Sequence, residues 1–155
     1  MCKLCWSLLT ILLLVVAFFS YKFIYLGETE PLADGRIAIQ LNSSERDLVL
    51  AEMRGFVATL QRVIQGIARE ELTEAATAAR QAGMAAQGGV PVSLVGKLPM
   101  AFKKLGLDTH QKFDQLALDA EQMGDTSHTL TQLGELMQNC VSCHASYRIA
   151  IDHEQ

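Results

Sequence analysis

Two cysteines and a histidine toward the C-terminal end of the chain have a spacing that can support chemistry. They lie in the stretch Cys140-Val141-Ser142-Cys143-His144, a C-x-x-C-H pattern. On a helix, positions i, i+3 and i+4 share one face, so two thiols and one imidazole can meet the same planar ring. C-x-x-C-H is the attachment pattern for c-type haem, in which each thiol forms a thioether with a vinyl group. We therefore predict one covalent haem held by Cys140 and Cys143, with His144 as an axial iron ligand.

Zinc binding and a disulfide are the alternative interpretations of these cysteines. Structural zinc normally takes four ligands, whereas the motif offers three. The remaining histidines are scattered along the chain, and we expect them to be surface residues rather than ligands: His110, His128 and His153. A disulfide would leave the adjacent histidine without a role. Haem is the favoured prediction, and a structural zinc-binding bundle is the alternative from another class of protein.

A long apolar segment at the N-terminal end, residues 6–26, predicts a membrane anchor. About 20 helical residues at roughly 1.5 Å each span a hydrocarbon core of roughly 30 Å. Tyr21, Lys22 and Tyr25 at the end of the segment suit a membrane–water interface. Bulky aromatic side chains also occupy the places where a signal peptidase needs small ones. We expect an uncleaved anchor, with a cleaved signal sequence as the alternative, and both export the rest of the chain.

The segment before the anchor, residues 1–5, is a short tail that would face the cytoplasm. Cys2 and Cys5 in this tail have C-x-x-C spacing, but no further ligand lies nearby in the sequence. We interpret them as two reduced thiols.

The exported part of the chain is acidic. Only two of the 13 basic residues, Lys3 and Lys22, precede residue 27, whereas all 17 acidic residues follow it, so the net charge of the exported part is about −6. No basic stripe is available for a phosphate backbone, which argues against nucleic acid as a partner.

After the anchor, the polar segment 27–43 is predicted to be a linker. Ile37, Ile39 and Leu41 alternate as in a strand. Because no partner strand is evident, we expect an extended linker here, and we predict no strand elsewhere in the chain.

Four later segments have the apolar spacing of amphipathic helices. They cover about residues 45–68, 70–86, 109–123 and 126–151. Gly55 and Gly66 weaken the first of them, which suggests a close approach of haem or another helix, although a tolerated glycine is equally compatible. The sequence therefore predicts an all-α four-helix bundle over residues 44–152, with the haem motif on the last helix.

The haem motif and its surroundings resemble the class II cytochromes c, the family of cytochrome c prime and its low-spin relatives. The resemblance lies in the stretch 140–148, in the segment 113–120 and in Gly124-Asp125, and it covers about residues 44–150. The position of the motif at the C-terminal end is typical of this family, whereas class I cytochromes c have it near the N-terminus. The anchor and the linker are not covered by the resemblance.

The resemblance also implies what lies on the other side of the iron. The distal position of the family, early on the inward face of the first helix, falls on Met53. A methionine ligand there gives a low-spin iron suited to electron transfer, whereas an apolar blocker leaves the iron open to small gases. Methionine is also a common core filler, and the chain has six. By the same resemblance, Arg148 would neutralise a haem propionate, and Tyr147 would pack on the ring edge.

These observations predict a membrane-anchored, mono-haem electron carrier rather than an enzyme. We expect it in a bacterial inner membrane with the haem domain in the periplasm, or free in the periplasm if the N-terminal segment is cleaved. Its expected partners are redox proteins there, and the resemblance implies pairing as a homodimer. The alternative function is a five-coordinate protein that binds nitric oxide or carbon monoxide.

Overall fold

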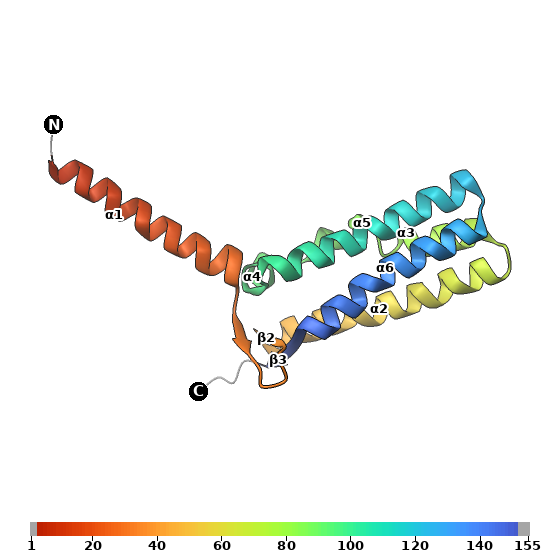
Figure 1. Ribbon diagram of the computed structural model, residues 1–155, viewed down its shortest axis with the longest axis horizontal. Helices are drawn as coiled ribbons and strands as arrows, with labels where there is room; N and C mark the ends of the chain where they lie inside the picture. The colour runs from red at the N-terminus through yellow and green to blue at the C-terminus, as the bar shows by residue number, and fades with distance from the viewer. Residues whose placement is uncertain (1–2, 152–155) are drawn as a thin grey trace.

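The computed structural model describes residues 3–151, most of which are helical (Figure 1). The helices are α1 (Lys3–Ser20), the π-helix η1 (Tyr21–Leu26), α2 (Ser43–Ala68), α3 (Leu72–Arg80), the 3-10 helix η2 (Met84–Gly89), α4 (Val92–Lys97), α5 (Met100–Met123) and α6 (Thr126–Ser146). The strands are β1 (Thr29–Pro31), β2 (Ile37–Leu41) and β3 (Tyr147–Ile151). The predicted tail is described only from Lys3 onward, and His153 lies outside the described residues.

The N-terminal helix projects away from the rest of the molecule (Figure 1). Together α1 and η1 form one helical segment, Lys3–Leu26, with a mean hydropathy of 2.3, and none of its most apolar stretch is buried by protein. This segment is long and apolar enough to cross a membrane, and a signal sequence would have the same properties. It ends at Gly27, where φ is +68° and the backbone packs directly on the end of α4. A side chain at this position would meet backbone atoms of Lys97, Leu98 and Pro99.

A three-stranded sheet corrects the prediction of a strand-free linker and of a fourth helix reaching residue 151. β2 lies in the middle, antiparallel to β1 and parallel to β3, with Ile37 opposite Tyr147 and Leu41 opposite Ile151. The partner of β2 is therefore the segment Tyr147–Ile151, which lies within the predicted fourth helix, 126–151. Tyr147 and Ile151 fit an i, i+4 helical face as well as an alternating strand, and a run this short does not distinguish the two.

Two of the predicted helix boundaries were also wrong. The second predicted helix, 70–86, ends as an α-helix at Arg80 and resumes only as the 3-10 helix η2. The third begins at Met100 rather than 109, immediately after Pro99, and is preceded by the short helix α4. Proline is compatible with the start of a helix, because the first N–H groups have no intrahelical partner.

The helical body is held together by α3 and α5. α3 packs against both α2 and α5, and α5 packs along α6, whereas α2 touches α6 only sparsely. The alanine-rich core lies among these helices; its buried residues are Val63, Ala75, Ala76, Ala78, Ala79, Ala82, Phe113, Leu116, Ala117, Ala120, Leu133 and Leu136. A Cβ atom at Gly66 would lie 2.8–3.0 Å from Ala75, so this glycine permits a close approach of α2 and α3. Gly55 has open space instead.

A second, smaller core lies at the end of the body near the sheet. This sheet-end core consists of Ile39, Leu41, Val49 and Leu94. It therefore joins β2, the start of α2 and α4.

Candidate functional site

The predicted haem motif lies in the last two turns of α6. Cys140 and Cys143 are half-buried free thiols, and His144 is exposed. Burial, together with the neighbouring Cys140, raises the pKa of Cys143 to about 11, and burial also raises the pKa of Cys140. Both thiols are therefore protonated and uncharged at neutral pH. The motif offers two neutral thiols and an imidazole on one end of a helix.

A polar cluster next to the motif fixes α6 against α5. The Asn139 side chain is buried; its amide nitrogen donates to Asp108 at 2.7 Å and to the Thr109 hydroxyl at 3.2 Å. Its carbonyl oxygen accepts from Lys112 Nζ at 3.0 Å, and the same Lys112 pairs with Asp108 at 2.9 Å. Because Asn139 directly precedes Cys140, these bonds set the rotation of α6 at the motif. The sequence did not reveal this cluster, because the partners of Asn139 come from α5 and are about 30 residues away along the chain.

Tyr147 connects the motif to the sheet. It is the first residue of β3, its ring contacts Phe102 edge-to-face at 5.4 Å between centroids, and it packs against the sheet-end core. Burial raises the pKa of Tyr147, with a further contribution from the nearby Cys143. Tyr147 thus lies beside the motif.

Arg148, the next residue, is exposed on β3 and lies opposite Ala38 of β2. It is near Asp34, whose pKa is lowered mainly by hydrogen bonds with Arg36 and to a smaller extent by Arg148. Nothing within the described residues holds the Arg148 guanidinium in a buried position, so it is accessible to an anionic group.

Met53 is brought to the same end of the molecule from α2. It is half-buried and packs against the sheet-end core, as Tyr147 does. The pairing of β2 with β3 explains this, because β2 leads into α2 and β3 follows α6. The structure therefore places all six predicted site residues at one end of the helical body: Met53, Cys140, Cys143, His144, Tyr147 and Arg148.

The donor set fits a covalently attached haem. The two thiols are free, and no hydrogen bond or ion pair within residues 3–151 engages the His144 ring. α2 contacts α6 less extensively than it contacts α3. Among the described residues, no group of three or more His, Cys, Asp and Glu side chains is arranged to hold a metal ion.

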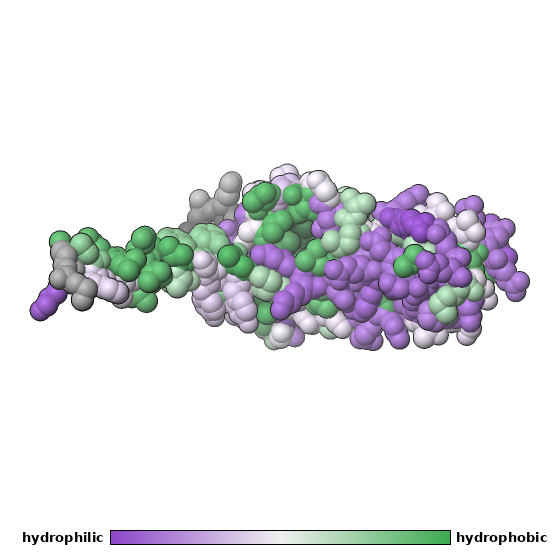
Figure 2. Space-filling view, turned by 90° about the horizontal axis from the view of Figure 1, so that it is seen from above, coloured by the Kyte–Doolittle hydropathy of each residue, from purple (hydrophilic) through white to green (hydrophobic). Residues whose placement is uncertain are grey.

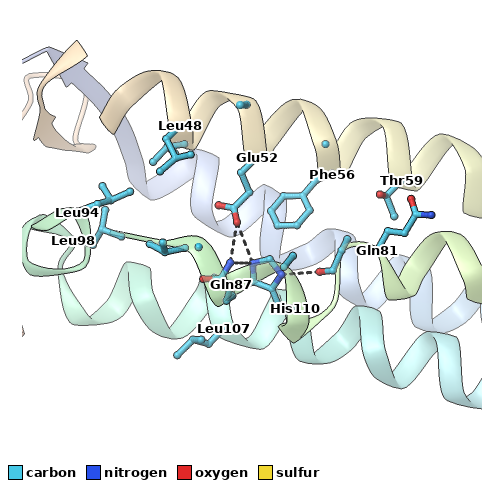
Figure 3. Close-up of a pocket in the computed structure, with 18 of the residues that line it drawn as sticks. Leu48, Glu52, Phe56, Thr59, Gln81, Gln87, Leu94, Leu98, Leu107 and His110 are labelled. Carbon is cyan, nitrogen blue, oxygen red and sulfur yellow. Dashed lines mark hydrogen bonds and ion pairs between the residues drawn. The ribbon is translucent and has the colours of Figure 1, made fainter. Parts of the chain in front are cut away.

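A cavity elsewhere in the described part of the chain is a different site, and none of the six predicted residues lines it (Figure 3). Glu52 of α2, Gln87 of η2 and His110 of α5 meet there. The expectation that His110 is a surface residue was wrong, because it is only 2% exposed. It lies three residues before the buried Phe113 on the inward face of α5, a periodicity that could have revealed its burial.

No known protein family, no curated protein and no solved structure matches this chain.

Proposed function

We propose that the chain is a mono-haem c-type cytochrome that carries single electrons. The observation that supports this best is the pair of free, neutral thiols at i and i+3 of α6, with an uncommitted imidazole at i+4. Bound haem iron supplies one-electron redox chemistry at potentials set by its axial ligands and surroundings. Cys140 and Cys143 would hold the group through thioethers, and His144 would be the proximal ligand.

The surrounding residues have supporting roles in this proposal. Asn139 fixes the rotation of α6, so that both thiols and the imidazole stay on one face. Tyr147 closes the motif on the sheet side and excludes water there, while the exposed Arg148 can pair with a propionate. The exposure of His144 leaves this edge of the site open to a partner protein.

We further propose that α2, α3, α5 and α6 form a four-helix bundle of the class II cytochrome c type. Three of the four neighbouring helix pairs, α2 with α3, α3 with α5 and α5 with α6, pack closely. The fourth pair, α2 with α6, is the loose one, and it carries Met53 on one side and the haem motif on the other. The sheet is an addition to that architecture.

The apolar segment Lys3–Leu26 would anchor the protein in a bacterial inner membrane, with the haem domain in the periplasm. The rings of Tyr21 and Tyr25 stack at 5.5 Å at its end, where an aromatic pair suits the membrane–water interface. The alternative is a cleaved signal sequence and a soluble periplasmic protein. The partners would be redox proteins of that compartment, and a second copy of the chain is a further proposed partner.

A gas-binding function is the second candidate, and the packing of Met53 favours it. Met53 contacts the sheet-end core, which is what a methionine that only fills space would do. In that case the sixth iron position would be open to nitric oxide or carbon monoxide. The spin state of the ferric protein separates the two functions, since methionine ligation gives low-spin iron.

The haem proposal is tested by denaturing electrophoresis of the full chain followed by staining for haem peroxidase activity. The wild type should retain haem on the polypeptide after boiling with reductant. The double substitution Cys140→Ala/Cys143→Ala should abolish the stain, and Cys5→Ala is the control that should keep it. A pyridine haemochrome spectrum without haem in purified wild type, expressed together with the c-type maturation system, would overturn the proposal.

A further inference from the structure

The cavity beside α2 arises because α3 is short. α3 ends at Arg80, and the segment that continues past it, including η2 and α4, covers α2 and α5 without filling the space between them. The cavity has a volume of about 620 Å³. That is within the roughly 300–1,000 Å³ of small-molecule sites, which are mostly apolar with a few convergent polar groups. Figure 2 shows an apolar, hollowed area on the helical body beside the anchor.

The polar groups of the cavity converge from three separate segments (Figure 3). The Gln87 amide donates to Glu52 Oε1 at 2.9 Å and lies 2.5 Å from His110 Nε2. His110 Nδ1 lies 2.6 Å from the carbonyl oxygen of Ala82, to which it can donate, and Nε2 lies 3.4 Å from Glu52 Oε1. Burial lowers the pKa of His110, but Glu52 and the backbone carbonyls outweigh it and raise the pKa overall. We refer to Glu52, Gln87 and His110 as the polar trio.

The polar trio leaves hydrogen-bond acceptors for a ligand. Within the described residues, Glu52 Oε2 has no hydrogen-bond partner, and the Gln87 amide group can exchange its hydrogen bonds between His110, Glu52 and a ligand. A ligand head group that donates a hydrogen bond therefore suits Glu52, whereas an anionic head group would be repelled by this carboxylate. Lys103, a cation among the lining residues, donates from Nζ to the carbonyl oxygen of Ile24, which directs its ammonium group toward the end of η1. Arg62, the other lining cation, is an exposed residue further along α2.

The apolar part of the cavity lies on the side of α4. Leu94 and Leu98 are on this side of the polar trio, with Leu107 below them in Figure 3. α4 and α5 in turn contact η1, the end of the apolar N-terminal segment. A molecule with its head at the polar trio would therefore direct its apolar part toward the membrane end of the protein.

We infer that this cavity binds a lipid-soluble hydroquinone, with its ring hydroxyls donating to Glu52 and Gln87 and its tail along the leucines. A hydroquinone is neutral, so its head group enters an apolar cavity at lower desolvation cost than an ammonium group or a phosphate. The inference rests on the proposed function for the membrane location and for a redox role of the ligand. The binding itself needs neither haem nor turnover.

The inference is tested by anaerobic titration of the full chain, in detergent micelles, with decylubiquinol. One molecule should bind per chain, and Glu52→Gln should weaken binding at least about tenfold by replacing an acceptor oxygen with a donor. Leu107→Trp should fill the cavity and weaken binding by a similar factor. Leu118→Trp is the matched control on α5: Leu107 and Leu118 are 44% and 41% exposed, but only Leu107 lines the cavity. The control substitution Leu118→Trp should change the affinity for decylubiquinol less than twofold.

Several outcomes would overturn the inference: no saturable binding, equal weakening by both tryptophan substitutions, or decanoate binding as tightly as decylubiquinol. Circular dichroism of each variant checks that its helices are folded. We expect Leu107→Trp and Leu118→Trp to fold, because both leucines are exposed. Haem content is measured on the same samples by pyridine haemochrome. Quinol binding without haem would contradict the proposed function alone, and haem without quinol binding would contradict this inference alone.

Discussion

The two cores of the molecule differ in composition and in how many buried residues they contain. The alanine-rich core includes Ala75, Ala76, Ala79 and Ala117, all fully buried, and one glycine lets two helices approach closely. Small side chains allow short distances between helix axes, and this core joins α2, α3, α5 and α6 directly. The sheet-end core has only four buried members and is surrounded by half-buried side chains.

Two of the predicted site residues, Met53 and Tyr147, lie at the second of these cores. Met53 and Tyr147 both pack there without being fully buried. A large core with many buried residues fixes helix positions, whereas a small core bordered by half-buried side chains lies close to the surface, where a large group can be placed against it. We infer that the alanine-rich core provides most of the stability, and that the sheet-end core positions the functional groups. The following substitutions test this division.

The largest effect on stability is expected for Phe113→Ala. Phe113 is fully buried in the alanine-rich core and stacks on Phe56 at 5.6 Å between ring centroids. Removing the ring should lower the free energy of unfolding by about 3–5 kcal/mol. Urea denaturation followed by circular dichroism measures this, and the exposed Leu118→Ala should cost less than about 1 kcal/mol. A loss under about 1 kcal/mol for Phe113→Ala would contradict the role given to this core.

A smaller and more local effect is expected for Ile39→Ala. Ile39 is fully buried in the sheet-end core and lies opposite Ile149 of β3. The substitution should cost about 2–4 kcal/mol and should release β3, so that amide hydrogen exchange in residues 147–151 becomes faster than in α3. Ile37→Ala in the same strand is the control, since Ile37 is 39% exposed. Uniformly faster exchange throughout the chain would show that the two cores unfold as one unit.

The pH dependence of stability should include a contribution from Glu45 at the start of α2. Burial raises the pKa of this carboxyl, but hydrogen bonds from Lys97 and from the backbone N–H of Asn42 outweigh it and lower the pKa overall. A lowered pKa in the folded state gives stability that is present above the unfolded-state pKa and is lost as the pH falls through the folded-state pKa. Glu45→Gln should therefore lower the free energy of unfolding by about 1–2 kcal/mol at pH 7. The variant should also lose less of its stability than the wild type does as the pH falls below about 4.5.

Denaturation midpoints measured between pH 3 and pH 7 test the contribution of Glu45. Asp47→Asn, at an exposed position of the same helix, should lose as much stability as the wild type does when the pH falls. If Glu45→Gln and Asp47→Asn both lose the same stability as the wild type between pH 7 and pH 3, the Glu45–Lys97 pair does not stabilise the contact between α2 and α4.

The smallest effect on stability, and the most informative spectrum, is expected for Met53→Leu. Leucine has nearly the volume of methionine, so the loss of stability should stay below about 1.5 kcal/mol. If Met53 is the distal ligand, ferric iron should change from low-spin to high-spin and the reduction potential should fall. Electronic absorption, including the weak near-infrared band of methionine ligation, measures the change, and Met137→Leu is the control. A wild type that is already high-spin and does not respond to Met53→Leu would favour the gas-binding function.

The sequence predicted the helical content and the main helices, because long apolar periodicities are strong signals. It did not predict the sheet, since the partner of β2 is more than 100 residues away and its five residues also fit a helical pattern. The end of α3 at Arg80 was missed because the alanines on both sides of it have high helix propensity, although Gly83 shortly after Arg80 is a helix-ending signal. The cavity that follows from this short helix could not be predicted either.

The predicted site residues could be grouped from the sequence only in part. Cys140, Cys143 and His144 are close in sequence, so their common helix face follows from the spacing. The placement of Met53 at the same end depends on the β2–β3 pairing, which the sequence did not reveal. The role of Asn139 required the structure, because its partners come from α5.

The parallel pairing of β2 with β3 also has a consequence for the order of folding. The strands Ile37–Leu41 and Tyr147–Ile151 enclose the whole helical body between them, so their pairing closes a loop of about 100 residues. Closing such a loop is entropically costly until the helices have shortened the distance between its ends. We expect the pairing of β2 with β3 to form late, after α3 and α5 have packed, whereas the local pairing of β1 with β2 does not have this cost. Until then, Cys140 and Cys143 next to β3 would stay accessible, which the proposed haem attachment requires.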